Sequence, residues 1–506
     1  MSGSEDEGAV FSAAIPAAGS LADRRRDQGA GSFVSTRNAC KLCSPLGACI
    51  ALRGIEGCIP LIHGSQGCST YIRRYGISHF REPIDIASSN FVESTAIFGG
   101  KDNLFTALDN VSRSYKPAAI GVTSTCLSET IGENVPLYIK QYEAERDAGK
   151  RNNAGCSPEI FYASTASYRG THMSGFHEAI RAVVGALVKD GAAGGPEGIP
   201  GGKARSRINL ISGFVSAGDL RELHRILADF TGGKDSPRTA YTLLPDYSES
   251  LDGPSWEDYQ KLPPGGTKTA DIQRMGEAAG TIYLGNFPGG GRTGESGGDA
   301  GTWLEEHCGV PLRRLDLPIG IEKSDAFFAA LAGFSGREIP ESYRKERERL
   351  VDAYIDGHKY LNRKRAVLYG EEDFVTSLAA FLDEIGVVPV LAATGAESPA
   401  FKSRIRGVLG NCSQDTVILQ DTDFTSMLEL AKDLEPDFIM GHSKGLYLSR
   451  ELKIPLVRCG FPIHDRIGGQ RILHLGYSGT LNLFDLVCNS LMEAKQNRFT
   501  KGYTYI

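Results

Sequence analysis

Short apolar runs rich in β-branched residues alternate with amphipathic helical stretches along most of the chain. The runs expected to form buried parallel strands are 118–125, 208–214, 365–370, 416–421 and 437–442. The stretches expected to form helices between such strands include 218–230, 372–386 and 425–434. Regular alternation of this kind predicts doubly wound units, and therefore an α/β fold with parallel β-sheets flanked by helices.

Two changes in composition divide the 506 residues into three Rossmann-like domains. A Gly/Pro-rich stretch at 189–207 separates the first domain from the second, and a charged helical stretch at 340–365 separates the second from the third. The expected layout is an N-terminal arm at 1–38, domain I at 39–190, domain II at 206–339, a connecting helix at 340–364, domain III at 365–480, and a C-terminal helix and tail at 481–506.

Composition argues against two classes of partner. The net charge of −6 and the pI near 6.0 give no basic surface for nucleic acid. No apolar run approaches the roughly 18 residues of a membrane span. The N-terminal arm has an acidic start and no continuous apolar segment, so it does not resemble a signal peptide and we expect a cytoplasmic protein. We expect the arm to order only against a partner.

Eleven cysteines, an odd number in a chain without an export signal, favour reactive or metal-bound thiolates over disulfides. Cys43, Cys68 and Cys126 follow loop-forming or strand-ending contexts, and Cys126 falls where a buried strand ends, at the edge where open α/β sheets bind ligands. Three thiolates from three loops suit a soft metal or an Fe–S cluster, with a partner chain or a non-cysteine ligand completing the site. Three separate buried thiols are the alternative.

Three other motifs are interpreted as structural, without a metal or a nucleotide. Cys40 and Cys43 form a C-x-x-C pair, but no second pair follows, so structural zinc is disfavoured. The stretch "GGGRTG" at 289–294 contains a formal G-x-G-x-x-G, yet it lacks a P-loop lysine and an acidic residue about 20 positions later, so we expect a surface loop in the Gly-rich region 288–299 and no nucleotide. Cys488 lies at helical spacing among apolar residues and is expected in the core.

Several blocks, matched in order and spacing over about 450 residues, resemble the β-subunit of nitrogenase component 1, the molybdenum–iron protein and its vanadium and iron-only relatives. The blocks are "KLCSPLGACIALRGIEGCIPLIHGSQGC", "HFREPIDIASSNFVESTAIFGGKDNLFTALDNV", "IGVTSTCLSETIGENV", "LDLPIGIEKSDAFFAAL", "ERERLVDAYIDGHKYLNRKRAVLYGEEDFV" and "IPLVRCGFPIHDRIGGQRILHLGYSGTLNL".

The resemblance implies that Cys43, Cys68 and Cys126 are the β-side ligands of the P-cluster, an 8Fe–7S centre shared with an α-like subunit, with Cys68 as the bridging ligand. A simple 4Fe–4S cluster is the alternative. Gly64 and Gly67, in the loop that carries Cys68, are expected to let the backbone approach a bulky inorganic cluster.

Two further residues match positions around that cluster. Ser167, in "TASYRGTH", matches a serine whose oxygen ligates iron when the cluster is oxidised. Tyr71, three residues after Cys68, matches an aromatic residue between the P-cluster and the catalytic cofactor. The resemblance therefore implies five side chains and one glycine, Gly67, in the cofactor-binding region.

A second metal site is implied independently of the cysteines. Arg81 and Glu82, in "FREP", together with Asp352 and Asp356, in "LVDAYIDGH", match a mononuclear site between two β-subunits. The aspartates are four residues apart and so share one helix face. Oxygen ligands suit a hard cation, Fe or Ca; a solvated helix face is the alternative.

The resemblance also implies a function. In this family the β-subunit relays electrons from a homodimeric, ATP-hydrolysing Fe–S reductase to an Fe–S cofactor in the α-subunit of an α2β2 heterotetramer. The stretch "YIRRYGISHFREPIDIASSNF" departs from molybdenum nitrogenase, which favours a nitrogenase-like methylthio-alkane reductase that cleaves C–S bonds in small organic sulfur compounds.

Three alternatives to that reading stay open. They are a dinitrogen-reducing β-subunit, the β-like half of a cofactor-assembly scaffold and, with less resemblance, a protochlorophyllide or chlorophyllide reductase subunit. The stretches "GYSGTLNL" and "LLPDYSESLDGPSW" look scaffold-like, whereas the complete set of cluster cysteines favours a catalytic subunit.

Overall fold

The computed structural model of the chain describes residues 39–151, 153, 155–189, 207–232, 241–285, 298–410 and 415–498. Three of the sequence-based predictions fall wholly or mainly outside these ranges: the N-terminal arm at 1–38, most of the Gly/Pro-rich stretch at 189–207, and the glycines of the motif at 289–294.

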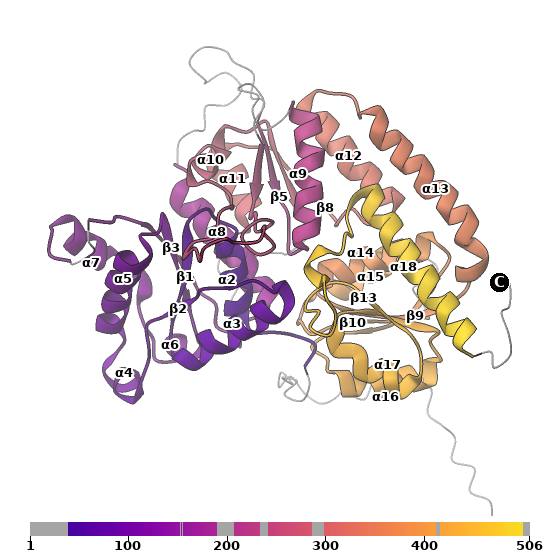
Figure 1. Ribbon diagram of the computed structural model, residues 1–506, viewed down its shortest axis with the longest axis horizontal. Coiled ribbons are helices and arrows are strands. Elements are labelled where there is room, and N and C mark those ends of the chain that lie inside the picture. Colours follow the sequence, from indigo (N-terminus) through magenta and orange to yellow (C-terminus); the bar gives the residue numbers. More distant parts are fainter. Residues whose placement is uncertain are drawn as a thin grey trace, which may run out of the picture.

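Three separate sheets, all with parallel strands, organise the described residues. Their strand orders are β2-β1-β3-β4, β6-β5-β7-β8 and β11-β10-β9-β12-β13. Every adjacent pair of strands is parallel, and helices pack around each sheet (Figure 1). The predicted α/β class is therefore confirmed. Below, each sheet with the helices that join its strands is called a unit; the exact domain boundaries stay a prediction.

The first unit carries the cysteine-rich part of the chain. It contains α2 (Ser44–Arg53), β1 (Cys58–His63), α3 (Gln66–Phe80), β2 (Ala87–Ser88), α4 (Glu93–Phe98), α5 (Lys101–Tyr115), β3 (Ala119–Ser124), α6 (Cys126–Thr130), α7 (Val135–Asp147), β4 (Glu159–Ala163) and α8 (His172–Leu187). All residues of β1 and β3 are buried, as expected for central parallel strands covered on both faces.

The second unit is built in the same way around a four-stranded sheet. It contains β5 (Ile208–Ile211), α9 (Ala217–Thr231), β6 (Tyr241–Leu244), α10 (Thr269–Gln273), η1 (Met275–Glu277), β7 (Gly280–Leu284), α11 (Ala300–Cys308), β8 (Leu312–Leu315) and α12 (Ile321–Ser335). Strand β5 ends earlier than the predicted 208–214, because Gly213 has φ +66° and its backbone lies against the carbonyl of Leu284.

The third unit follows the long charged helix α13 (Glu341–Leu361). It contains β9 (Arg365–Gly370), α14 (Glu372–Glu384), β10 (Val388–Thr394), α15 (Phe401–Leu409), β11 (Val417–Leu419), α16 (Phe424–Leu434), β12 (Phe438–Gly441), η3 (Ser443–Gly445), α17 (Leu446–Leu452), β13 (Leu456–Arg458), η4 (Gly469–Arg471) and α18 (Gly476–Asn497). Helix α18 runs beside α13 (Figure 1). Cys488 of α18 is 7% exposed, so its predicted place in the core is confirmed.

The three units meet in a buried aromatic junction. The ring of Phe461, from the third unit, lies 5.1 Å from that of Phe214 in the second unit and 6.1 Å from that of Phe80 in the first. Close by, the buried His172 Nε2 lies 2.8 Å from Glu371 Oε1 and joins the first unit to the third. None of the helices in the described ranges combines the length and the apolar character needed to cross a bilayer.

Candidate functional site

The carboxyl ends of β1, β3 and β4 lie side by side at one edge of the first sheet. His63, the last residue of β1, pairs in register with Ser124, the last residue of β3, and β4 lies on the other side of β3. The segments that leave these three strand ends carry Cys68, Cys126 and Ser167. Parallel strands thus deliver three of the predicted site residues to one edge, which is where open α/β sheets bind ligands.

Cys43 reaches the same edge from another direction, as the N-cap residue of α2. Helix α2 packs so closely against α8 that a Cβ atom at Gly47 would overlap the carbonyl oxygen of His172. The amide of Ser44, directly after Cys43, donates to Ser167 Oγ at 3.2 Å. The contact between the two helices therefore fixes Cys43 against the segment that carries Ser167.

The three thiols and Ser167 lie within interaction distance of one another. The Ser167 amide donates to Cys126 Sγ at 3.3 Å, and the Ser65 hydroxyl donates to Cys68 Sγ at 3.7 Å. Desolvation raises the pKa of Cys43, and the charges of Cys126 and Cys68 raise it further, while a hydrogen bond with Ser167 lowers it. The charges of Cys126 and Cys68 thus oppose ionisation of Cys43, and a cationic group bound between the thiols would offset this repulsion.

Each thiol also lies at the start of a helix. Cys43 caps α2, Cys68 is the third residue of α3, and Cys126 is the first residue of α6. The free N–H groups and the positive end of the helix dipole favour anionic ligands at such positions.

Two glycines near Cys68, Gly64 just before α3 and Gly67 in its first turn, have different environments. A Cβ atom at Gly67 would have only Ser65 Oγ near it, at 3.8 Å, so the space above Gly67 is open. A Cβ atom at Gly64 would instead lie 2.5 Å from Thr125 Oγ1. Thr125 Oγ1 in turn donates to the carbonyl of His63 at 3.2 Å. Gly64 therefore packs the loop of Cys68 against the residue before Cys126, whereas Gly67 leaves room for a bulky group.

A partly buried carboxylate ties the segments of Cys126 and Ser167 together. Glu129 Oε1, in the same short helix as Cys126, accepts hydrogen bonds from the hydroxyls of Ser124 (2.5 Å), Ser164 (2.7 Å) and Tyr162 (3.0 Å). Burial alone would raise the pKa of Glu129, but these three donors lower it below its ordinary value. The carboxylate thus stays ionised while it joins the ends of β3 and β4.

Large apolar side chains around the thiols are exposed. Tyr71, one turn after Cys68, is 46% exposed, and its ring lies 4.6 Å from that of Tyr75. Leu127, next to Cys126, is 40% exposed, and Tyr168 is 52% exposed. Apolar side chains grouped on one face in this way are typical of a surface that a partner protein covers.

The segment before Cys43 is anchored on the third unit. The Cys40 amide donates to the carbonyl of Thr422 at 3.2 Å, and Lys41 Nζ lies 2.6 Å from Asp421 Oδ1. Cys40 itself is buried in the core of the third unit, while Cys43 is exposed on the first. The C-x-x-C pair thus divides between two environments.

A single metal ion does not fit the thiols. Within the ranges that the structure describes, no three His, Cys, Asp or Glu side chains are arranged to hold one ion. The thiols instead form an open, convergent half-site with room above Gly67, which fits a cluster of several irons whose remaining ligands come from another chain.

The four residues of the predicted mononuclear site are not brought together in one chain. Arg81 ends α3 with φ +64°, and its guanidinium donates to the carbonyl of His464 at 2.9 Å. Burial and the nearby charge of Asp252 raise the pKa of Glu82. Asp352 and Asp356 are exposed on α13, which lies along the outer edge of the molecule, away from α3 (Figure 1). A shared ion would therefore need a second copy of the chain.

Sequence reasoning missed three residues near the thiols. Ser65 lies in the same "HGSQGC" loop as Cys68, so its spacing could have indicated it. Glu129 is three residues after Cys126 in the turn of a helix, a weaker signal. Lys444, whose Nζ donates to the carbonyl of Ala39 at 2.8 Å, is 405 residues distant in sequence, and no local pattern could have placed it here.

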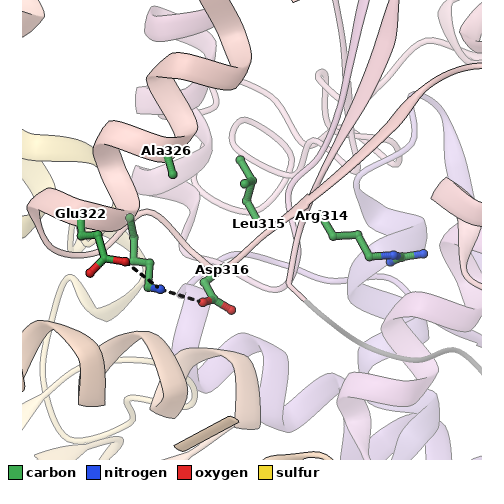
Figure 2. A pocket seen from close by; sticks show the side chains of 6 residues that line it. Arg314, Leu315, Asp316, Glu322 and Ala326 are labelled. Carbon is green, nitrogen blue, oxygen red and sulfur yellow. Dashed lines mark ion pairs between the residues drawn. The ribbon is translucent and has the colours of Figure 1, made fainter. Parts of the chain in front are cut away.

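A separate pocket lies in the second unit at the carboxyl end of β8. Its lining consists of Arg314, Leu315, Asp316, Glu322, Lys323 and Ala326 (Figure 2). Lys323 Nζ lies 3.3 Å from Asp316 and 3.6 Å from Glu322, and Arg314 pairs with Asp299. Because its charges pair with one another and no predicted site residue lines it, this pocket does not carry the candidate function.

Comparison with known proteins gives one family. Residues 43–492 match the family described as nitrogenase component 1 type oxidoreductase. The nitrogenase molybdenum-iron protein beta chain of Clostridium pasteurianum is 34% identical over 469 residues, 92% of this chain and 95% of that protein. The beta chain of Frankia alni is 34% identical over 464 residues, 90% of this chain and 83% of that protein.

Solved structures give the same result. A chain of nitrogenase Cp1 at pH 6.5 superposes with a TM-score of 0.83 at 32% identity, covering 95% of this chain and 98% of the other. A second chain, of nitrogenase Cp1 at pH 5, superposes with a TM-score of 0.65 at 16% identity and shows the fold alone.

Proposed function

The chain belongs to the nitrogenase component 1 family of oxidoreductases, as a β-like subunit, and on this premise we propose that Cys43, Cys68 and Cys126 hold half of an interfacial 8Fe–7S cluster of the P-cluster type. The observation that carries the proposal is the convergence of these thiols at one exposed sheet edge. A 4Fe–4S cluster is the alternative with the same ligands.

The residues of this chain have distinct tasks at the proposed cluster. The three thiolates bind iron, and the helix starts beneath them stabilise their negative charge. The amide of Ser167 donates to Cys126 Sγ, which places the Ser167 hydroxyl beside the thiols, where the resemblance expects an oxygen ligand. Such a cluster, when bound, supplies reversible one-electron storage.

The exposed apolar face supports a partner at this edge. Tyr71, Leu127 and Tyr168 surround the thiols and would be covered by an α-like subunit that provides the remaining cluster ligands. We propose an α2β2 assembly in which this chain relays electrons from a homodimeric, ATP-hydrolysing Fe–S reductase to an Fe–S cofactor in the α-like subunit. Tyr71, beside Cys43, would lie on the side that faces that subunit.

We further propose that Arg81 and Glu82 of one copy, with Asp352 and Asp356 of a second copy, bind a mononuclear Fe or Ca ion. The support is chemical: carboxylate and carbonyl oxygens are ligands for hard cations, and the two aspartates are exposed on one face of α13.

For the substrate, we propose small organic sulfur compounds whose C–S bond is reduced. A dialkyl sulfide would take up two electrons and two protons and give an alkane and a thiol. Dinitrogen is the second candidate, favoured by the identity of about one third to chains named as molybdenum-iron protein beta chains. A role as the β-like half of a cofactor-assembly scaffold is less well supported, because all three cluster cysteines are present and converge.

The test is iron content and EPR of the anaerobically purified complex, before and after dithionite and mild oxidation. An oxidisable cluster that is EPR-silent when reduced, beside a separate cofactor signal, would support a catalytic component 1. Simple 4Fe–4S signals alone would favour the assembly scaffold. The active complex is then incubated with dimethyl sulfide or with labelled dinitrogen. Formation of methane and methanethiol would identify the organic sulfur compound as a substrate, and formation of labelled ammonia would identify dinitrogen.

A further inference from the structure

Lys444 joins the third unit to the start of the cysteine segment. It lies in η3, the turn after β12, and its Nζ donates to the carbonyl of Ala39 at 2.8 Å. Ala39 is four residues before Cys43. The third unit thus places an ammonium group beside the segment that carries one of the proposed cluster ligands.

The charge of Lys444 has no counter-ion in the part of the chain that the structure describes. No carboxylate there lies within ion-pair distance of its Nζ, and the side chain is only half-buried. By contrast, Lys41, which ties down the same segment, is paired with Asp421 at 2.6 Å. Of these two lysines, therefore, only Lys444 lacks an ion-pair partner among the described residues.

The field of this charge reaches the cysteine segment. Desolvation raises the pKa of the Cys40 thiol, the charge of Glu371 raises it further, and the charge of Lys444 lowers it. It also lowers the pKa of His464, after the larger effect of burial. The groups that feel the charge of Lys444 thus include the thiol of Cys40 and the imidazoles of His442 and His464. The carboxylate of Glu371 acts on two of them, but it is hydrogen-bonded to His172 and forms no ion pair with Lys444.

We propose that Lys444 is a positioning residue that raises the reduction potential of the cluster held at Cys43, through an unpaired charge supplied by the third unit. The inference rests on the proposed function. A cluster becomes more negative when it gains an electron, so a fixed positive charge nearby stabilises the reduced state. The partly buried position of Lys444 limits screening by salt, and the contribution should persist at physiological ionic strength.

The alternative is a purely structural tether through the hydrogen bond to Ala39. Three variants of the assembled complex separate the two roles. Lys444→Gln keeps a donor but removes the charge, and Lys444→Arg keeps both. The matched control is the double variant Lys41→Gln/Asp421→Asn, which breaks a neighbouring tie of the same segment with no change in net charge.

The measurement is the midpoint potential of the cluster by EPR-monitored redox titration, with iron content on the same samples. We expect Lys444→Gln to bind iron normally and to shift the reduction equilibrium about tenfold toward the oxidised state, a potential lower by about 59 mV for a one-electron couple. Lys444→Arg and the double control should stay close to wild type.

Other outcomes would overturn the proposal. An unchanged potential in Lys444→Gln with normal iron would rule out the charge effect, and an equal shift in the double control would assign the effect to the tether. Loss of iron from Lys444→Gln would make Lys444 an anchor. A wild-type complex that binds no cluster would instead overturn the proposed function, and this inference with it.

Discussion

The thiols at the edge of the first sheet and the carboxylates on α13 are two candidate metal sites with opposite constructions. Cys43, Cys68 and Cys126 come from three segments and converge in a single chain. Asp352 and Asp356 come from one helix, and no other predicted ligand lies beside them in the same chain.

The difference follows from how each element presents its side chains. Parallel strands end at a common edge, so residues far apart in sequence meet there. A single helix face brings together only residues three or four apart, and it depends on a neighbouring surface for the rest. The cysteine site should therefore respond to changes within this chain, and the carboxylate site to its assembly.

The largest effect is expected from Cys68→Ala. Loss of the bridging thiolate should remove nearly all cluster iron and weaken assembly with the α-like subunit. Iron analysis and size-exclusion chromatography of the complex measure both. Cys156→Ala is the matched control, because Cys156 is half-buried and its thiol donates to the carbonyl of Pro117 at 3.7 Å, in a part of the first unit outside the proposed site. A stable heterotetramer with unchanged iron in Cys68→Ala would contradict the convergence argument.

A severalfold loss of cluster is expected from Gly67→Val, because the new side chain would fill the open space beside Cys68. The free energy of unfolding should change little, since no protein atom lies closer than 3.8 Å to the added Cβ. Iron content and urea denaturation measure the two quantities.

The neighbouring glycine gives the opposite control. Gly64→Ala should lower the free energy of unfolding by about 1–3 kcal/mol, because its Cβ would overlap Thr125. Normal cluster spectra in Gly67→Val would contradict the steric role of Gly67.

A smaller effect is expected from pH, at the junction that anchors the cysteine segment. Burial lowers the pKa of His79 and of His442 to about 3. In the unfolded chain each titrates near 6.5, so protons favour unfolding as the pH falls from 6.5 toward 3, and stability is complete above 6.5. At pH 5.5 each histidine should cost about 1.4 kcal/mol relative to pH 7.5.

Urea denaturation followed by tryptophan fluorescence measures this dependence, and His442→Gln should remove about 1.4 kcal/mol of it. A free energy of unfolding that is the same at pH 7.5 and 5.5 would show that these imidazoles are already accessible to protons in the folded chain.

The smallest effect on the cluster is expected from Asp352→Asn/Asp356→Asn. The double variant should lose the mononuclear ion and keep its Fe–S iron, because α13 packs mainly against α18 and lies away from α3 (Figure 1). Metal analysis of the assembled complex distinguishes the two pools. Loss of Fe–S iron together with the mononuclear ion would show that the two sites are coupled. It would contradict the expectation that they respond to different changes.

Local sequence patterns predicted the positions of several strands and of one core residue. The apolar runs that became β3, β9 and β12 were located to within one residue at each end, because buried parallel strands need continuous apolar sequence. Cys488 was placed in the core by its helical spacing. The early end of β5 was missed, since it depends on the backbone of Leu284 in another strand.

The candidate site was harder to predict where it depends on distant contacts. Its cysteines were identified by resemblance, and their convergence follows from strand order. The role of Gly64 against Thr125 and the approach of Lys444 to Ala39 are tertiary contacts across 61 and 405 residues, which no periodicity encodes.

The anchoring of the segment before Cys43 has a mechanical consequence. Cys126 lies at the end of a strand of the first sheet, and Cys68 lies in α3, whose far end is hydrogen-bonded to His464 of the third unit. Cys43 is tethered to the third unit more directly, through the neighbouring Cys40 and Lys41. A small rotation of the third unit against the first would therefore displace Cys43 and Cys68 relative to Cys126. A rigid inorganic cluster bound to all three thiols would restrain the movement of the first unit relative to the third. Binding of the cluster should therefore slow amide hydrogen exchange in β12, the strand that ends next to η3.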